Sequence, residues 1–174
     1  MLKNRPLQVI FWTATALVAV VDQLSKRIIV DGQVISREFK LLSGVFFRLA
    51  PTGNSGVVWG LFGRWPQTVL IVGILAAALV VYYFYKVSEE SRPESLALGM
   101  ILGGALGNLI DRAAVGYVKD FLMFTLWQYQ WPTFNVADSF ITIGAAVLLL
   151  SFFLGKGSAA SKTSPNDGKR EKSS

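Results

Sequence analysis

Four long apolar stretches alternate with shorter polar segments along this chain. They cover residues 7–29, 66–85, 95–111 and 137–154, close to the roughly 20 residues that a helix needs to cross a bilayer. The pattern predicts an all-α integral membrane protein with four transmembrane helices. The first stretch is long and lacks a small-residue cleavage site, so we interpret it as a retained span and not as a signal peptide.

An even number of spans places both termini on one side of the membrane. Lys3, Arg5 and the basic C-terminal segment favour the cytoplasmic side. The loop after the first span also carries basic residues, which weakens this bias. We expect a multi-pass protein with both termini in the cytoplasm.

Two segments between the predicted spans are too polar to cross the membrane and too apolar for a solvated loop. In residues 31–65, the stretch 39–49 is typical of two short strands around a Ser-Gly turn. Residues 113–134 form an aromatic-rich loop that suits a membrane interface. We expect both segments at the outer membrane surface, half-buried among the lipid headgroups.

The composition narrows the possible chemistry. Of the residues, 52% are hydrophobic and 16% charged, whereas soluble domains carry about a quarter charged residues. The chain has neither cysteine nor histidine, which excludes thiolate metal sites, disulfides and the usual general base of serine and cysteine hydrolases. Carboxylates, lysines or hydroxyls must therefore transfer protons in any enzymatic reaction, and we expect no metal and no cofactor.

The net charge of +6 does not indicate nucleic-acid binding. Much of the excess lies in residues 155–174, a Ser-, Lys- and Gly-rich segment without the aromatic residues that stack on bases. We therefore expect one membrane domain over residues 1–154 and a disordered basic cytoplasmic tail over 155–174.

Acids and amides interrupt the apolar pattern in three motifs, VDQLSK, GNLIDR and FNVADS. Ionisable residues in a membrane usually mark a substrate path, a proton relay or a catalytic site. At a rise of about 1.5 Å per residue, these motifs and two positions in the outer segments reach one level near the extracytoplasmic face. The residues concerned are Asp22, Lys26, Asn54, Asn108, Asp111, Arg112, Asp120, Asn135 and Asp138.

Each motif also has a purely structural interpretation. Asp22 and Lys26 have the i,i+4 spacing of a helix ion pair. Asn135 and Asp138 have the spacing of a helix N-cap with a first-turn acid.

Three further features have structural interpretations too. Asp111 beside Arg112 suits interfacial anchoring, and Asp120 suits a solvated loop. Gly99, Gly103 and Gly107 form a small-residue ridge, for which we favour close helix packing over a functional role.

Two facing carboxylates can share a proton, because two like charges a few ångströms apart do not both ionise easily. One then activates a water while the other polarises the carbonyl under attack, which hydrolyses an amide without a metal, histidine or thiol. We favour Asp120 and Asp138 for this pair. Asp22 and Asp111 compete, but each has a basic neighbour that favours its ionised form.

Two other functions remain open at this point. A small proton-coupled transporter or channel also uses buried acids, although these polar residues cluster at one face and do not thread the bilayer. A membrane scaffold would use the glycine ridge for assembly, but would not need polar residues from separate elements at one depth.

The motifs, in this order, strongly resemble those of the bacterial lipoprotein signal peptidases, the type II signal peptidases. The matching residues are Asp22-Gln-Leu-Ser-Lys26, Asn54-Ser-Gly56, Gly107-Asn108-Leu-Ile-Asp111-Arg112, Lys119-Asp120-Phe and Asn135-Val-Ala-Asp138. The resemblance covers the whole chain except the tail.

The resemblance implies an inner-membrane aspartic endopeptidase. Such enzymes remove the signal peptide of diacylglyceryl-modified prolipoproteins, just before the lipidated cysteine, and globomycin inhibits them at the active site. By this resemblance Asp120 and Asp138 are catalytic. Residues that bind the substrate are then Asn54, Asn108, Arg112 and Asn135; residues that support the site are Asp22, Lys26, Gly56 and Asp111. Residues 31–65 are then a small sheet and a surface helix that cradle the substrate.

The chain departs from the family pattern in two places. Val57, Val58 and Trp59 replace the small residues and phenylalanine frequent after Asn-x-Gly, which changes the expected shape of the substrate groove. Lys119 replaces the apolar residue common before the second-loop aspartate. We predict that Lys119 faces away from the carboxylate pair.

Overall fold

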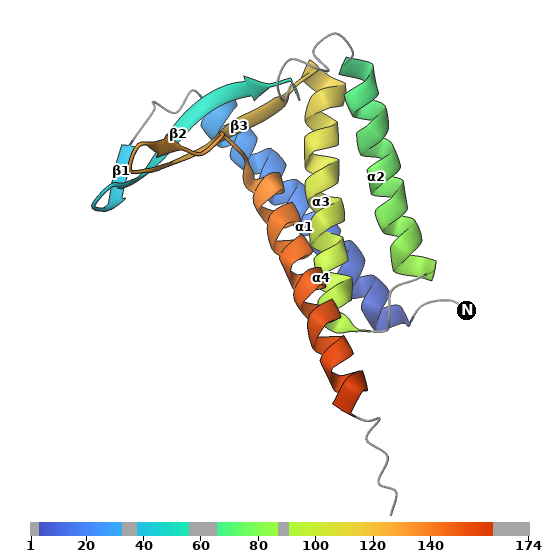
Figure 1. Cartoon of the computed structure of the whole chain (residues 1–174). Helices are drawn as coiled ribbons and strands as arrows, with labels where there is room; N and C mark the ends of the chain where they lie inside the picture. The colour runs from blue at the N-terminus through green and yellow to red at the C-terminus, as the bar shows by residue number, and fades with distance from the viewer. Residues whose placement is uncertain (1–3, 33–37, 56–65, 87–90, 162–174) are drawn as a thin grey trace, which may run out of the picture.

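The computed structural model describes residues 4–32, 38–55, 66–86 and 91–161. Four helices run side by side, and a small sheet projects from one end of them (Figure 1). The helices are α1 (Arg5–Lys26), α2 (Pro66–Lys86), α3 (Arg92–Val115) and α4 (Val136–Ser161). Among the described residues, these four are long and apolar enough to cross a membrane, which confirms the predicted spans.

The helix ends differ from the prediction in two places. A π-helical turn, η1 (Arg27–Asp31), extends α1 beyond its last α-helical residue. The fourth helix continues past Leu154 to Ser161, so the first residues of the predicted tail are helical, and residues 162–174 lie outside the described part of the chain.

The third helix is central, because it contacts each of the other three. The predicted glycine ridge packs against α1: a Cβ on Gly99 would lie 2.5 Å from the carbonyl oxygen of Phe11, and one on Gly103 would lie 2.6 Å from that of Thr15. Only glycine permits this approach of the two backbones, so the packing role predicted for the ridge is confirmed.

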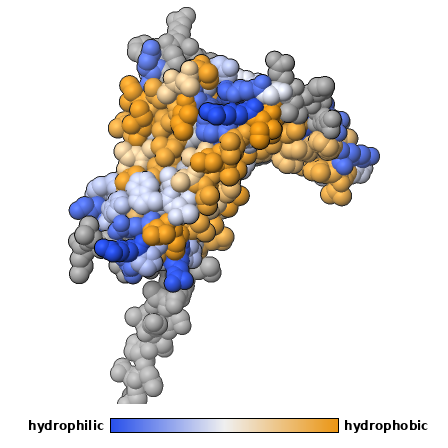
Figure 2. Space-filling model, turned by 180° about the vertical axis from the view of Figure 1, so that it is seen from behind, coloured by the Kyte–Doolittle hydropathy of each residue, from blue (hydrophilic) through white to orange (hydrophobic). Residues whose placement is uncertain are grey.

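Apolar side chains face both the interior and the surroundings of the helices. Phe11 of α1 stacks on Phe84 of α2, with ring centroids 3.9 Å apart, at the centre of the described core. Figure 2 shows hydrophobic residues along the helical body and hydrophilic ones gathered towards its two ends. In water such a surface would be costly, whereas in lipid it is the expected one.

The sheet has four antiparallel strands in the order β1 (Glu38–Leu42), β2 (Val45–Asn54), β3 (Val118–Leu126) and β4 (Tyr129–Gln130). The first two strands confirm the predicted hairpin. Residues 113–134, which we predicted as a loop, instead supply β3 and β4. The run of β-branched and aromatic residues there is typical of a strand, and pairing with β2 satisfies its backbone. The predicted surface helix falls on residues outside the described ranges.

The two hairpin tips of the sheet touch. Trp127 has a left-handed backbone (φ 52°), and its amide donates to the carbonyl of Gly44 at 2.5 Å. Gly44 is itself left-handed (φ 77°), and a Cβ there would meet the Trp127 ring. The contact joins the tip of β1–β2 to that of β3–β4 and leaves the Trp127 side chain 74% exposed.

Candidate active site

The start of α4 holds two of the predicted site residues in a reciprocal cap. Asn135 Oδ1 accepts a hydrogen bond from the backbone amide of Asp138 at 3.0 Å, and Asp138 Oδ2 accepts one from the amide of Asn135 at 3.3 Å. Such a pair satisfies two amides at a helix start. The structural interpretation of this motif is therefore confirmed, and the cap also fixes the direction in which both side chains point.

Asp120 lies on β3 and is fully buried. Both of its oxygens accept hydrogen bonds: Asn54 Nδ2 donates to Oδ2 at 2.9 Å, and Asn135 Nδ2 donates to Oδ1 at 2.7 Å. The interpretation as a solvated loop acid is therefore wrong.

The neighbouring side chain of β3 points to the opposite face, as alternation along a strand requires. Lys119 Nζ lies 2.8 Å from a carboxylate oxygen of Asp31. The prediction that Lys119 faces away from the carboxylate pair is confirmed.

Asn108 of α3 connects the second carboxylate to the same network. Its Nδ2 donates to Asp138 Oδ1 at 2.8 Å. Its Oδ1 accepts from Asn135 Nδ2 at 3.0 Å and from Lys26 Nζ at 3.1 Å. Because two donors converge on Oδ1, the amide must present its own donor to Asp138. The two asparagines thus link Asp120 and Asp138 through side-chain hydrogen bonds.

The two carboxylates also interact electrostatically. The pKa of Asp120 is raised to about 6, chiefly because burial disfavours the charged form. The hydrogen bond from Asn54 lowers this pKa, and the negative charge of Asp138 raises it. Asp120 therefore retains its proton at a higher pH than an exposed aspartate does.

The competing acids are engaged elsewhere. Lys26 Nζ lies 2.7 Å from Asp22 Oδ2 and 2.8 Å from Asp111 Oδ2, and all three side chains are buried. The predicted Asp22–Lys26 ion pair is therefore present. Asp111 pairs with Lys26 and not with the adjacent Arg112, so it does not anchor the helix at the interface.

One described residue of the predicted set, Arg112, is not part of this network. Arg112 lies one helical turn beyond Asn108 on α3, and its buried Nε has no hydrogen-bond partner in the described part of the chain. Gly56 falls outside the described residues, as do Val57, Val58 and Trp59. The other predicted site residues, from three helices and two strands, meet at one end of the helices.

A cleft of about 450 Å³ opens beside Asp138. One wall is the first turns of α4, including Ser139, Thr142 and Ile143, and the other is the segment from Trp131 to Phe134. This wall of α4 faces the surroundings of the helices. The cleft therefore reaches the half-buried Asp138, whereas Asp120 is fully buried and is not among its described lining residues.

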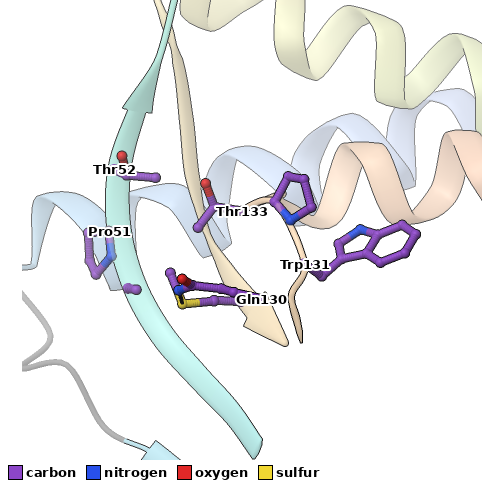
Figure 3. A pocket seen from close by; sticks show the side chains of 8 residues that line it. Pro51, Thr52, Gln130, Trp131 and Thr133 are labelled. Carbon is purple, nitrogen blue, oxygen red and sulfur yellow. Dashed lines mark hydrogen bonds between the residues drawn. The ribbon is translucent and has the colours of Figure 1, made fainter. Parts of the chain in front are cut away.

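A second pocket, of about 380 Å³, lies over the sheet and includes Thr52, the residue paired with Asp120 in the strand register (Figure 3). Gln130 reaches across it towards β2 and donates to Met123 Sδ, whereas Trp131 points away. None of the described residues that line this pocket is an acid or a base, so they offer contacts but no proton transfer.

Sequence reasoning missed Gln23 and two backbone amides. Gln23 Nε2 donates to the carbonyl of Gly107 at 3.0 Å and to Asp111 Oδ1 at 3.1 Å. Its position beside Asp22 within an apolar span was the available signal. The amides of Lys119 and Ala137, which donate to Asp111 and Asp22, carry no sequence signal because every non-proline residue has one.

Comparisons with known proteins agree on one family. A family model described as signal peptidase (SPase) II matches residues 14–154. A lipoprotein signal peptidase of Symbiobacterium thermophilum is 39% identical over 142 residues, which cover 80% of this chain and 91% of the relative. One of Burkholderia multivorans is 41% identical over 145 residues, covering 79% and 84%.

Solved structures agree with the fold. A bacterial membrane enzyme determined at 2.3 Å matches with a TM-score of 0.74 and 25% identity, covering 100% of this chain and 99% of the other. A second, at 1.9 Å, matches with a TM-score of 0.70 and 29% identity, covering 80% and 90%. Because the family match extends over most of the sequence and the relatives share one name, the chain belongs to the signal peptidase II family of multi-pass membrane proteases.

Proposed function

We propose that this protein is an aspartic endopeptidase that removes signal peptides from diacylglyceryl-modified prolipoproteins. Asp120 and Asp138 are the catalytic pair, and cleavage falls just before the lipidated cysteine. The observation that carries the proposal is the interaction of two carboxylates, one enclosed and one open to a cleft, through Asn108 and Asn135. The family match supports the substrate class.

In the reaction, the ionised member of the pair takes a proton from a water, and the water oxygen attacks the scissile carbonyl carbon. The protonated member gives its proton to the carbonyl oxygen, which produces a neutral tetrahedral diol. Collapse of this diol breaks the C–N bond: one carboxyl proton passes to the cysteine nitrogen, and the other carboxylate takes a proton from a diol hydroxyl as the new carboxylic acid forms. The pair ends with one proton, as it began, so no metal, histidine or thiol takes part.

The asparagines have a defined part in this scheme. Asn54, Asn108 and Asn135 donate to the carboxylates, and these donors restrict where the charged oxygens lie. Arg112 has a buried Nε without a partner in the described residues, which suits a contact with a substrate carbonyl. Such contacts are needed, because a signal-peptide helix must unwind at the scissile bond and lose its own hydrogen bonds.

The cleft beside Asp138 accounts for substrate entry. The signal peptide is itself an apolar helix, so it approaches from the lipid along α4 and reaches the pair through this cleft. The diacylglyceryl chains stay in lipid and hold the cysteine at the depth of the carboxylates. Globomycin-type inhibitors occupy the same cleft.

We place the protein in the bacterial inner membrane, with the sheet and the carboxylate pair at the extracytoplasmic face and both termini in the cytoplasm. Figure 1 shows the start of α1 and the end of α4 at the end of the molecule opposite the sheet, which is compatible with this orientation. None of the relatives described above is a transporter.

Cleavage of a purified diacylglyceryl-modified prolipoprotein in detergent tests the proposal. We expect Asp120→Asn and Asp138→Asn each to lower kcat by about 100- to 10,000-fold, because each removes a titratable proton while keeping the side-chain shape. Asp31→Asn, at an exposed acid paired with Lys119, is the matched control and should keep full activity. EDTA should not affect the wild type. Normal cleavage by either folded variant of the pair would contradict the assignment.

A further inference from the structure

Lys26 is the centre of a buried charge cluster formed with Asp22 and Asp111. Its side chain is 1% exposed. An ammonium group has three N–H donors, and here three acceptors surround it: Asp22 Oδ2 at 2.7 Å, Asp111 Oδ2 at 2.8 Å and Asn108 Oδ1 at 3.1 Å. No donor of Lys26 is left for a substrate, so its role lies within the protein.

The two carboxylates of the cluster each hold a backbone amide as well. Asp22 Oδ1 accepts from the amide of Ala137 at 2.9 Å. Asp111 Oδ2 accepts from the amide of Lys119 at 3.0 Å. These two amides belong to the residues directly before the two proposed catalytic aspartates, one on α4 and one on β3. One ammonium therefore joins both backbone segments through one carboxylate each.

We propose that Asp22, Lys26 and Asp111 are positioning residues that set the separation and alignment of the catalytic carboxylates. This inference rests on the proposed function. Because α4 and β3 are separate elements, a common partner is needed to hold their ends in a fixed relative position. Cleavage by a carboxylate pair depends on that relative position, since a displacement of about 1 Å is enough to lose about 100-fold in rate.

Stability alone does not explain the cluster. Apolar residues of similar volume often replace a buried ion pair without loss of stability. The surrounding contacts instead favour a defined geometry: a Cβ on Gly107 would collide with the Asp22 carboxylate, and Gln23 donates to Asp111 Oδ1 at 3.1 Å. The absence of a side chain at Gly107 leaves space for the Asp22 carboxylate, and Gln23 gives Asp111 an additional hydrogen bond. Both carboxylates are therefore held in place.

The test compares Asp22→Asn and Asp111→Asn with Asp31→Asn. The control, Asp31→Asn, removes the carboxylate that pairs with the Lys119 side chain. Asp111→Asn removes the carboxylate that accepts a hydrogen bond from the Lys119 backbone amide. Cleavage of a diacylglyceryl-modified prolipoprotein gives kcat and KM, and titration with globomycin gives the concentration of intact sites. We expect kcat per titrated site to fall about 10- to 100-fold in the two cluster variants, with KM within about twofold of the wild type.

An unchanged kcat per titrated site, even with a lower unfolding midpoint, would show a merely structural role and overturn the inference. A higher KM with unchanged kcat would assign the cluster to substrate binding and overturn it as well. If neither asparagine variant folds, Gln23→Leu replaces them, with a smaller drop in kcat expected and an unchanged kcat again decisive against the inference. The proposed function is judged separately, by the wild type, Asp120→Asn and Asp138→Asn.

Discussion

Burial, hydrogen bonds and the charges of neighbouring residues all act on the pKa of the Asp120 carboxyl. Its pKa lies at about 6, and the hydrogen bond from Asn54 lowers it, as the charge of Lys26 also does. The reactive form of the pair holds one proton, so kcat/KM should fall on the alkaline side as that proton is lost. Removal of the Asn54 donor raises the pKa, and the proton is then retained to a higher pH.

The Asn54→Leu variant is therefore expected to move the alkaline limb of the kcat/KM profile to higher pH, together with a lower maximal rate. The measurement is prolipoprotein cleavage across a pH series in one detergent. Thr52→Val, on the same strand and opposite Asp120 in the register, is the control and should keep the wild-type limb. A limb that stays in place or moves to lower pH in Asn54→Leu would contradict the assignment of this hydrogen bond.

Among the elements, the contact between α1 and α3 depends most directly on small residues. In Gly103→Ala the new Cβ would lie 2.6 Å from the carbonyl oxygen of Thr15 and 2.8 Å from the Cβ of Val18. The two backbones must separate, which costs about 1–3 kcal/mol for an overpacked site.

Thermal unfolding in detergent measures this cost. We expect a lower midpoint for Gly103→Ala than for the wild type. Leu96→Ala, a substitution on the same helix at a side chain 47% exposed, is expected to change the midpoint far less. Equal midpoints for Gly103→Ala and the wild type would show that the helices separate without cost.

The sheet shows the limit of local sequence patterns at the element scale. The hairpin of β1 and β2 was predicted because a Ser-Gly turn separates two β-prone runs. The strand that carries Asp120 was not predicted, although its composition is strand-like, because its partner β2 lies more than 60 residues away in the sequence. Pairing between segments so far apart in the sequence depends on which backbones come close together, and the packing of the helices determines this.

For the whole molecule, the expected orientation is open to a direct test because the chain contains no cysteine. A single cysteine at Gln128, in the turn between β3 and β4, should react with a membrane-impermeant maleimide in cells with a permeabilised outer membrane. A single cysteine at Ser174 should react only after the inner membrane is lysed. Labelling in the reverse order would place the sheet and the carboxylate pair on the cytoplasmic side.

Sequence alone was enough for the four spans, the ion pair of Asp22 and Lys26, the cap at Asn135 and the convergence of the polar motifs. These features depend on helix period, helix rise and the cost of charge in lipid, which are local rules. The link from Lys26 to the amides of Lys119 and Ala137 was decided by tertiary structure alone. Backbone amides are the same at every non-proline position, so only the packing of α1, α3, α4 and β3 determines which of them a buried carboxylate reaches.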